Sequence, residues 1–425
     1  MVGGSRQLTD TGRQLRLLIL TPFAPRLDAP HGGGKSLAQL VRELGRRHRV
    51  ALLCLRASDD PPTDDVVRGR CELVEEFPLP GVGGTPVERL RRKARLSLAL
   101  ARGRPTWAAD TAVRRFAARV EEHIRSWQPD VVQAEFHVMG QYLARASSSG
   151  LPARVLTEHE PGASAAAESS RTAQGPRRLL AWADSITWRR FESRVLERAD
   201  AVVAYTERDR QVLAELSPNA RLVVIPLGMD VPSDPASSPT PQSPDLVFIG
   251  NFMHPPNVDA ALRLVNGIFP RVVRRVPAAR LYLIGDRVPG VLRKAADSNV
   301  VVTGLVDEVS PYLERAAVVV VPLRTGGGQR VKVMEALAAG KPTVMSSLAA
   351  AGLEVAPGEE ALIAETEEEF ADAVLTVLQD HALRRSLAAG ARAWAERNLG
   401  WQRTIEGYER LYAELLRDRE IRSRT

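Results

Sequence analysis

The stretch Val318–Pro342, VVVVPLRTGGGQRVKVMEALAAGKP, joins a β-branched run to a helix-like run through three consecutive glycines. Its first four residues form a short, continuous β-branched run, which is typical of a buried strand in a parallel sheet. Met334 to Ala339 has the composition of a helix. The three glycines between them therefore lie on a strand-to-helix turn, where α/β proteins bind phosphate groups.

Strands and helices alternate along most of the chain. We expect strands at Leu15–Leu20, Val50–Leu55, Val131–Ala134, Val155–Thr157, Ala201–Tyr205, Leu222–Ile225, Leu246–Ile249, Leu281–Ile284, Val300–Val302, Val318–Val321, Pro342–Met345 and Leu362–Ala364. Helices are expected at Lys35–Arg46, Pro86–Leu100, Thr111–Ser126, Ser185–Ala199, Ala382–Arg397 and Thr404–Arg417. Such alternation predicts the α/β class, with parallel sheets covered by helices on both faces.

A change of composition divides the chain into two units of similar size. Residues 230–244, DVPSDPASSPTPQSP, are rich in proline and serine, which indicates an extended linker. A length of 425 residues also favours two domains. We expect a flexible leader at 1–14, a Rossmann-like domain at 15–229, the linker at 230–244, a second Rossmann-like domain at 245–400 and a final helical segment at 401–425.

Composition limits the class of protein. The hydrophobic content of 44% and the charged content of 26% are ordinary for a soluble globular chain. Cys54 and Cys71 give neither a disulfide framework nor the spacing of a metal site, so we expect a cytoplasmic protein. No apolar run is long enough to span a bilayer. The net charge of +7 suits anionic partners, but aromatic residues total only 5%, so nucleic-acid binding is not expected.

Glycine follows several expected strands of the second unit, at the edge where α/β sheets bind their ligands. Glycine lets a ligand approach the backbone closely. The candidate donor-binding residues at these strand ends are Gly250, Asn251, Asp286, Gly304, Gly326, Gly327 and Gly328. Any one such glycine is often only a turn, but several in one unit indicate a binding site.

Arg330 and Lys332 bring two positive charges to the start of a helix, where the helix dipole disfavours cations. That local cost indicates a bound anion. Glu335 shares a helix face with Lys332, and its carboxylate could accept hydrogen bonds from two ribose hydroxyls. Solvated cations and a surface Glu–Lys pair are the alternative interpretation. A nucleotide sugar would satisfy all three side chains.

The first unit contains a matching turn, His31-Gly-Gly-Gly-Lys-Ser36, between its first strand and a helix. It lacks the glycine spacing of a Walker loop, and we expect Gly33 and Gly34 to approach the same diphosphate from the opposite side. His159, flanked by two acids at a strand end, could donate a hydrogen bond to a sugar or phosphate. A histidine packed at a domain interface is the alternative. His123 and His381 are expected on the surface.

Together these motifs resemble the retaining family-4 glycosyltransferases, which have the GT-B fold of two Rossmann-like domains facing across a cleft. The segments that carry the resemblance are Val224–Asp230, Leu246–Gly250, Pro256–Asp259, Leu281–Asp286, Val302–Gly304 and Arg324–Pro342 in the second half, and more loosely the triple glycine, His159 and Glu192–Ala204 in the first. The resemblance covers nearly all of the chain after residue 15.

The resemblance implies a retaining hexosyltransferase that uses a nucleoside-diphosphate sugar and needs neither metal nor cofactor. Arg330 and Lys332 match the cations that neutralise the leaving diphosphate, and His159 matches the histidine that touches the donor sugar. Glu335 matches the carboxylate on the ribose, and the backbone of Gly304, Leu305 and Val306 would meet the base. The acceptor, whether a lipid-linked glycan, a polysaccharide or a small molecule, would bind the first unit, and the last helix would cross back onto that unit.

The chain departs from the family pattern near the donor. The first glutamate of the family's glutamate pair falls at Gly327, so a carboxylate near the donor sugar is missing. The usual arginine after the first strand of the second unit is Asn251, and the usual lysine is replaced near Asn257, which we also count as donor-binding. Two alternatives therefore stay open: a nucleotide-sugar epimerase of the same architecture, and a non-catalytic partner subunit that binds the donor.

A basic segment of the first unit favours contact with anionic lipid. Residues 88–104, ERLRRKARLSLALARGR, could form an amphipathic helix with Leu90, Ala94 and Leu98 on one side. We expect a peripheral contact with the inner face of a membrane or with a lipid-phosphate acceptor, and a solvated basic helix is the alternative. Trp182 and Trp188 are expected in the core or at an acceptor site.

Overall fold

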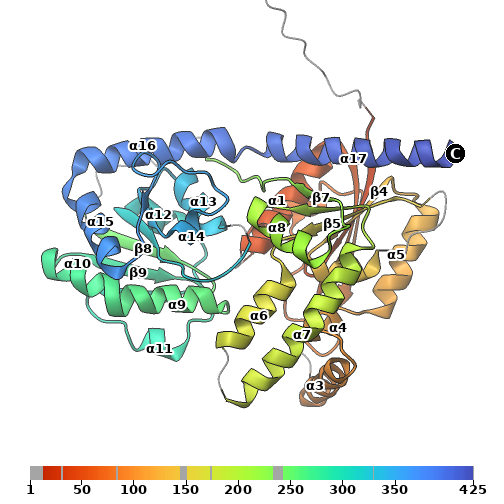
Figure 1. Cartoon of the computed structure of the whole chain (residues 1–425), viewed down its shortest axis with the longest axis horizontal. Helices are drawn as coiled ribbons and strands as arrows, with labels where there is room; N and C mark the ends of the chain where they lie inside the picture. Colours follow the sequence, from red (N-terminus) through yellow and green to blue (C-terminus); the bar gives the residue numbers. More distant parts are fainter. Residues whose placement is uncertain are drawn as a thin grey trace, which may run out of the picture.

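The computed structural model describes residues 13–29, 32–82, 85–143, 151–172, 175–232, 243–328 and 330–424. Within these ranges the chain forms two sheets in which every pair of neighbouring strands is parallel. Figure 1 shows the two sheets side by side, with helices on both faces of each and two long C-terminal helices running along one edge of the molecule. The predicted α/β class with two Rossmann-like sheets is confirmed.

The first sheet has the strand order β3-β2-β1-β4-β5-β6-β7. Its strands are β1 (Arg16–Thr21), β2 (Arg49–Arg56), β3 (Leu73–Pro78), β4 (Val131–Glu135), β5 (Ala153–Glu158), β6 (Ala201–Ala204) and β7 (Leu222–Val224). Strand β1 pairs with both β2 and β4, so the strand order reverses between β1 and β4. This reversal is the switch point at which α/β sheets bind ligands.

The second sheet repeats this arrangement with the order β10-β9-β8-β11-β12-β13. Its strands are β8 (Asp245–Ile249), β9 (Arg280–Ile284), β10 (Val300–Gly304), β11 (Val318–Val321), β12 (Thr343–Met345) and β13 (Leu362–Ile363). Here the order reverses between β8 and β11, with Val318 opposite Leu246. The glycine-rich turn after β11 therefore lies at the switch point of the second sheet.

The helices connect successive strands. Those of the first unit are α1 (Gly32–Arg47), α2 (Asp65–Arg68), α3 (Pro86–Ala101), α4 (Thr106–Asp110), α5 (Arg114–Ser126), the 3₁₀ segment η1 (His137–Tyr142), α6 (Gly162–Thr172), α7 (Pro176–Leu196) and α8 (Glu207–Leu216). Those of the second are α9 (Pro255–Arg263), the π-helical segment η2 (Leu264–Ile268), α10 (Phe269–Arg275), α11 (Gly290–Arg293), α12 (Ser310–Arg315), α13 (Val331–Ala338), α14 (Ser347–Ala350) and α15 (Glu367–Gln379). Two further helices, α16 (His381–Asn398) and α17 (Trp401–Arg424), end the chain.

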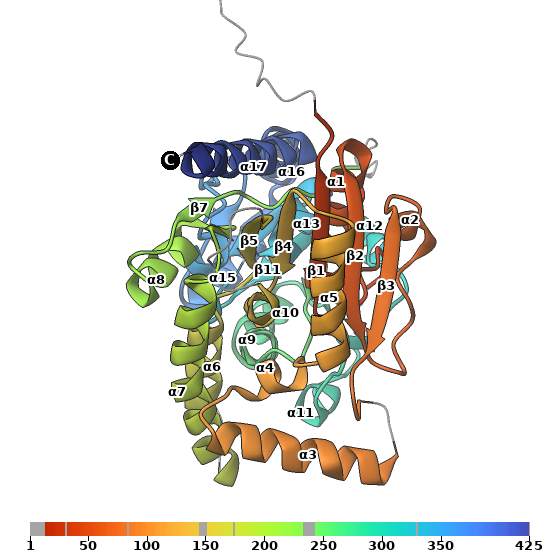
Figure 2. The ribbon, with the colours of Figure 1, turned by 90° about the vertical axis from the view of Figure 1, so that its right-hand side faces the viewer.

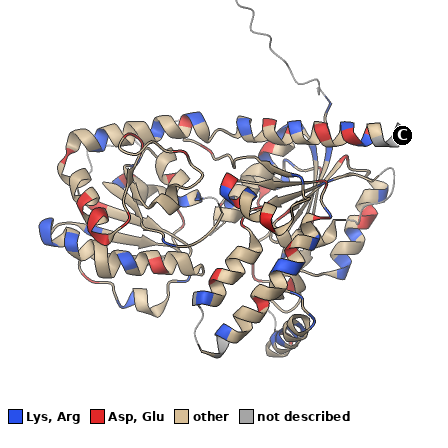
Figure 3. Ribbon diagram, viewed as in Figure 1, with Lys and Arg blue, Asp and Glu red and all other residues tan. Residues whose placement is uncertain are grey.

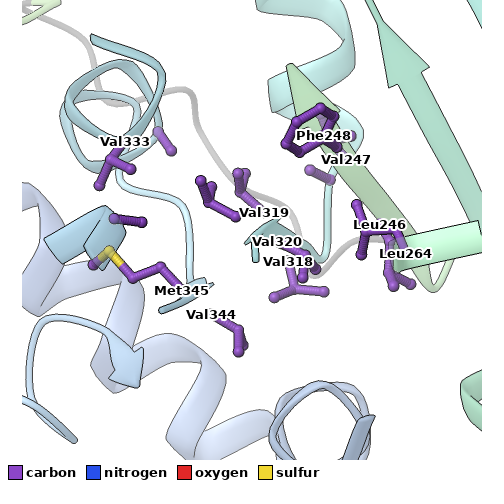
Figure 4. Close-up of a cluster of buried hydrophobic side chains, with 14 of the residues drawn as sticks. Leu246, Val247, Phe248, Leu264, Val318, Val319, Val320, Val333, Val344 and Met345 are labelled. Atoms are coloured by element: carbon purple, nitrogen blue, oxygen red, sulfur yellow. The ribbon is translucent and has the colours of Figure 1, made fainter. Parts of the chain in front are cut away.

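The valine-rich strand β11 lies at the centre of the second unit. Its four valines are each no more than 1% exposed. Figure 4 shows Val318, Val319 and Val320 between side chains of β8, such as Phe248, and side chains of β12, such as Met345. Covering on both faces explains why this strand is continuously apolar instead of alternating.

The C-terminal helices tie the two units together. Helix α16 contributes Leu387 and Trp394 to the core of the second unit. Helix α17 instead buries a stripe of side chains against the first sheet, in the same cluster as residues of β1, β4 and β5: Trp401, Ile405, Tyr408, Leu411, Tyr412 and Leu415. The hydroxyl of Tyr408 lies 3.3 Å from Thr157 Oγ1. The last helix therefore packs on the first unit, and the break between α16 and α17 lies where the chain passes from one unit to the other (Figure 1).

Several local expectations were wrong. The edge strand β3 was not expected, because Glu75 and Glu76 interrupt its apolar pattern; these carboxylates pair with Arg119 and Arg56. Helix α1 begins at Gly32 instead of residue 35, α5 at Arg114 instead of residue 111, and α7 at Pro176 instead of residue 185.

His123 is not a surface residue. It is 6% exposed, and its Nε2 lies 3.0 Å from Glu75 Oε1. The two tryptophans separate, since Trp188 is buried and Trp182 is 58% exposed.

Most of the expected leader and linker, namely residues 1–12 and 233–242, lies outside the described residues, as does His31. In the ranges that are described, every helix falls short of the length and apolarity that a bilayer span requires.

Candidate functional site

The candidate site begins at three turns that follow β8, β9 and β10. Gly250 N–H donates to Ile284 O at 2.9 Å, and Gly285 N–H donates to Gly304 O at 3.0 Å, so each turn is bonded to the next. Gly285 has a φ of +149°, and a Cβ there would lie 1.8 Å from Gly250 O. Only glycine fits at this position, because a side chain would collide with the backbone of the turn after β8.

Arg330 holds the glycine-rich turn after β11. It is the residue before α13, and its guanidinium donates from Nη1 to Gly327 O at 2.5 Å and from Nη2 to Gly326 O at 2.8 Å. The side chain is 7% exposed. Burial and the nearby Arg208 lower the pKa of Arg330 below its ordinary value. The interpretation of Arg330 as a solvated cation is therefore wrong, because the guanidinium lies inside the turn.

Lys332 lies in the first turn of α13, within a network of amide groups. Its Nζ donates to Asn257 Oδ1 and lies 5.1 Å from the centroid of the Phe248 ring. Asn257 Nδ2 in turn donates to Asn251 O at 2.7 Å. Burial and then the charge of Arg330 lower the pKa of Lys332 to about 7. The structure thus brings Asn251, Asn257 and Lys332 together at the switch point of the second sheet.

Glu335 lies one turn further along α13 and faces the first unit. Burial raises the pKa of Glu335, and the charges of Lys35 and Lys332 lower it. Lys35 belongs to α1, where a Cβ on Gly32 would lie 3.0 Å from Val331 Cβ. This contact brings the start of α1 next to the start of α13. Gly33 and Gly34 lie in the first turn of α1, and Gly34 is buried.

His159 follows β5 and is held by three neighbours. Its Nε2 lies 2.7 Å from Glu135 Oε2 and 3.3 Å from the Tyr205 hydroxyl. Its ring stacks on Phe136 with a centroid distance of 3.8 Å and an interplanar angle of 8°. The side chain of Glu135 is fully buried, so this carboxylate fixes the orientation of the imidazole. In the described part of the chain no partner is assigned to Nδ1, the nitrogen that a ligand could contact.

The two units meet directly at the glycine-rich turn. A Cβ on Gly328, which has a φ of +69°, would lie 2.8 Å from His159 O. Glu160 Oε1 accepts the Gly327 N–H at 3.2 Å, and Arg208 Nη1 donates to Gly326 O at 3.3 Å. Burial raises the pKa of Glu160, while the Gly327 N–H and Arg330 lower it. Glycine at 328 thus permits the close approach that joins the cationic turn to the acidic end of β5.

The remaining candidates lie further along the second sheet. Asp286 Oδ1 accepts the Arg287 N–H at 2.7 Å, and Leu305 is 58% exposed. Strand β10, which leads into Leu305 and Val306, is three positions from β11 in the strand order, or roughly 14 Å at ordinary strand spacing. The residues expected to bind the base are therefore separated from the cationic turn after β11 by about the length of a nucleoside diphosphate.

A buried cluster of His137, Glu158 and Glu192 lies next to the site and has the composition of a metal site. One ligand atom of each lies within 4.8 Å of the others. Glu192 already accepts the N–H groups of Gly162 and Ala163, each at 2.7 Å, at the start of α6. Burial raises the pKa of Glu192 to about 7. We assign this cluster the structural role of fixing α6 against β5.

Five residues of the site were not expected from the sequence. They are Lys35, Glu135, Glu160, Tyr205 and Arg208. Glu160 carried a usable signal, because it is one of the two acids that flank His159 at a strand end. Arg208 carried none, since it is one arginine among many on a helix and only the folding of the two units brings it to Gly326.

Comparison with known proteins gives two family matches. Residues 30–232 match the model described as Glycosyltransferase Family 4, and residues 243–380 match the model described as Glycosyl transferases group 1. Among curated proteins, the "uncharacterized 44.6 kDa protein in cps region" of Klebsiella pneumoniae is 22% identical over 163 residues. That match covers 36% of this chain and 42% of the relative, so the chain spans about two fifths of the length of the curated protein it matches.

Solved structures share the fold over nearly the whole chain. The sucrose-phosphate synthase of Thermosynechococcus elongatus superposes with a TM-score of 0.68 and 18% identity, covering 96% of this chain and 100% of that one. HepE of Anabaena in complex with UDP-glucose superposes with a TM-score of 0.63 and 16% identity, covering 94% and 100%. Since the two family models both describe glycosyltransferases and match residues 30–232 and 243–380, the chain belongs to the group 1, family-4 glycosyltransferases and has their GT-B fold.

Proposed function

We propose that the chain transfers a hexose from a nucleoside-diphosphate sugar to an acceptor hydroxyl, with retention of the anomeric configuration and without a metal ion. The observation that carries this proposal is the pair Arg330 and Lys332, held at the start of α13 where the two units meet. Two buried cationic side chains at a helix N-terminus offer an anion positive charge, a favourable helix dipole and a low local dielectric. UDP-sugars are the first donors to examine, because HepE was solved with UDP-glucose.

The reaction needs stabilisation of a leaving diphosphate. The bond between the anomeric carbon and the diphosphate oxygen breaks, and its electron pair stays on the diphosphate. The acceptor oxygen forms the new bond, and its proton passes to the leaving diphosphate. Arg330 and Lys332 would stabilise the charge that develops there, and His159, oriented by Glu135, would contact the donor sugar. Glu335 would bind the ribose, and the turn from Gly304 to Val306 would bind the base.

Thermal stabilisation by nucleotide sugars tests this proposal. Purified chain is heated with UDP-, GDP-, dTDP- and ADP-sugars in the presence of EDTA. A donor at ~100 times its dissociation constant should stabilise the fold by about 2.7 kcal/mol. Stabilisation by one base, lost in Arg330→Ala, would support the site; no stabilisation by any donor would contradict it. Conversion of the bound donor without acceptor would favour the epimerase, and binding that never leads to transfer would favour the partner subunit.

We also propose that the chain contacts the anionic inner face of a membrane through the basic segment 88–104, and that the acceptor is presented there. Helix α3 covers most of this segment and buries none of its residues. Arg92 and Arg95 bind Asp110, and Leu90 and Leu98 are exposed on the same helix. A capping box between Thr85 and Glu88 fixes the start of the helix.

The tip of the α6–α7 hairpin extends the same surface. Most exposed large apolar side chains in the described part of the chain lie on α3, α4 and α7: Val87, Leu90, Leu98, Trp107, Leu179, Leu180, Trp182 and Ile186. Figure 2 shows α3 next to the lower ends of α6 and α7, and Figure 3 shows lysine and arginine on all three. A cavity of about 530 Å³ at this tip includes Arg171, Arg178 and Trp182 in its lining. Cations beside exposed apolar side chains suit an anionic bilayer surface.

Binding to lipid vesicles tests the membrane contact. The chain should sediment with phosphatidylcholine vesicles that contain phosphatidylglycerol, and less so as salt rises. The pair Leu179→Glu and Leu180→Glu should weaken binding about 10-fold or more, because each change removes an exposed leucine from the surface that would enter the bilayer. Val291→Glu, at an exposed position of the second unit, is the control for a carboxylate added away from this surface. Equal binding by the pair and the control would contradict the proposal.

A further inference from the structure

Position 327 lacks the carboxylate that the family pattern would place there, but the volume beside it is not empty. A Cβ added to Gly327 would have Glu160 Oε1 at 3.2 Å, Glu160 Cγ at 3.3 Å and Glu160 Cδ at 3.7 Å as its three nearest atoms. A side chain on residue 327 and the side chain of Glu160 would thus compete for the same space. Gly327 is not among the glycines with positive φ, so its backbone conformation would accept a side chain.

Glu160 comes from the opposite unit and enters the site directly. It follows β5 and His159, and its Oε1 accepts the Gly327 N–H at 3.2 Å. The charge of Arg330 acts on the same carboxylate. Among the described residues no donor is assigned to Oε2, so one oxygen holds the glycine-rich turn and the other is available to a ligand.

We propose that Glu160 supplies, from the first unit, the donor-site carboxylate that is absent at Gly327. Oε1 holds the turn through the Gly327 N–H, and Oε2 accepts a hydrogen bond from a hydroxyl of the donor sugar. This inference rests on the proposed function. It assigns the recognition of the sugar to a residue of the first unit, which contacts the glycine-rich turn of the second unit.

The test separates the sugar from the nucleotide. Once a nucleotide sugar that stabilises the chain is known, the affinities for it and for its nucleoside diphosphate are measured by titration calorimetry with Glu160→Ala. The affinity for the nucleotide sugar should fall roughly 10- to 100-fold, as expected for a lost hydrogen bond to a charged group. The affinity for the nucleoside diphosphate should change less than about 3-fold. Glu215→Gln, an exposed glutamate on α8, controls for the loss of charge.

A rescue variant makes the test sharper. The substitution Gly327→Glu alone should impair transfer, because two carboxylates would then occupy one space. The double variant Glu160→Ala, Gly327→Glu should be at least 10-fold more active than Glu160→Ala, because the carboxylate returns from the other unit. The two substitutions together would then cost less activity than the sum of their separate effects, as expected for two groups that contact each other and can replace each other.

The outcomes distinguish the inference from the proposed function. If the unaltered chain binds no nucleotide sugar, the proposed function fails, and this inference fails with it. In a second outcome, the unaltered chain binds the nucleotide sugar and transfers the sugar, while Glu160→Ala lowers the affinity for the nucleoside diphosphate as much as the affinity for the nucleotide sugar. In that case Glu160 only shapes the turn, and the inference alone is overturned. A folded double variant no more active than Glu160→Ala would overturn it as well.

Discussion

Replacing Arg330 with alanine should lower sugar transfer by about 10²-fold or more, the loss expected when a preorganised group that stabilises developing charge is removed. The guanidinium is buried and spans the carbonyls of Gly326 and Gly327, so it lies fixed before the donor arrives. Its charge should matter most as the diphosphate leaves. The effect should therefore appear in kcat as well as in KM, measured by initial rates and single-turnover transfer.

Two controls separate charge stabilisation from damage to the turn. Arg324→Ala removes the same side chain from the same loop, where it is 55% exposed and pairs with Asp259, and should alter transfer by no more than about 3-fold. The nucleoside alone, which carries no phosphate, should bind Arg330→Ala as well as it binds the unaltered chain. Full transfer activity in a folded Arg330→Ala protein would show that the diphosphate lies elsewhere.

The strands of both sheets were largely predictable because parallel strands are buried on both faces and read as continuous apolar runs. The runs at β1, β8 and β11 are of this kind, and each is buried in the structure. The edge strand β3 was not predictable, since Glu75 and Glu76 interrupt its apolar residues and pair with Arg119 and Arg56 only in the folded chain. The start of α7 was missed because Leu179, Leu180 and Trp182 cover no core.

The candidate site also has a part that the sequence predicts and a part that only the folded chain reveals. Arg330, Lys332 and Glu335 lie within one short motif, and their spacing on α13 is local information that a sequence carries. Glu160 and Arg208 reach the same turn from the other unit, and their approach depends on the packing of two sheets and α17. The sequence shows that Gly327 lacks a carboxylate, but only the folded chain shows which side chain fills the space beside it.

Donor affinity should fall as the pH rises above about 7, because Lys332 must be charged to bind the diphosphate. Burial and the neighbouring Arg330 lower the pKa of Lys332 to about 7 in the unliganded chain. A bound diphosphate replaces lost solvation with an opposite charge and raises that pKa again. Between the two pKa values, binding takes up a proton, and the affinity should drop by up to tenfold for each unit of pH.

Lys332 should give the stability of the unliganded chain the opposite pH dependence. The folded pKa lies near 7 and the unfolded value near 10.5, so the unfolded chain binds more protons between these limits. The contribution of Lys332 to stability is therefore lowest below pH 7 and rises as the pH rises towards about 10. The deprotonation of Lys332 should therefore raise the stability of the ligand-free chain and lower its affinity for the donor. General alkaline unfolding would instead lower both.

Calorimetric titration of the nucleoside diphosphate between about pH 7 and 9 measures the change in affinity, because the phosphate itself titrates lower, near pH 6. Unfolding of the ligand-free chain over the same pH range measures the change in stability. Buffers of different ionisation enthalpy report the proton taken up. Lys332→Arg should bind with little change across this range, since arginine stays charged, whereas Lys332→Met should bind weakly at every pH. Lys294→Met, which removes an exposed lysine of the same unit, should keep the pH dependence of the unaltered chain. A flat affinity in the unaltered chain would place Lys332 outside the diphosphate site, and the anion would then rest on Arg330 and the backbone of the turn.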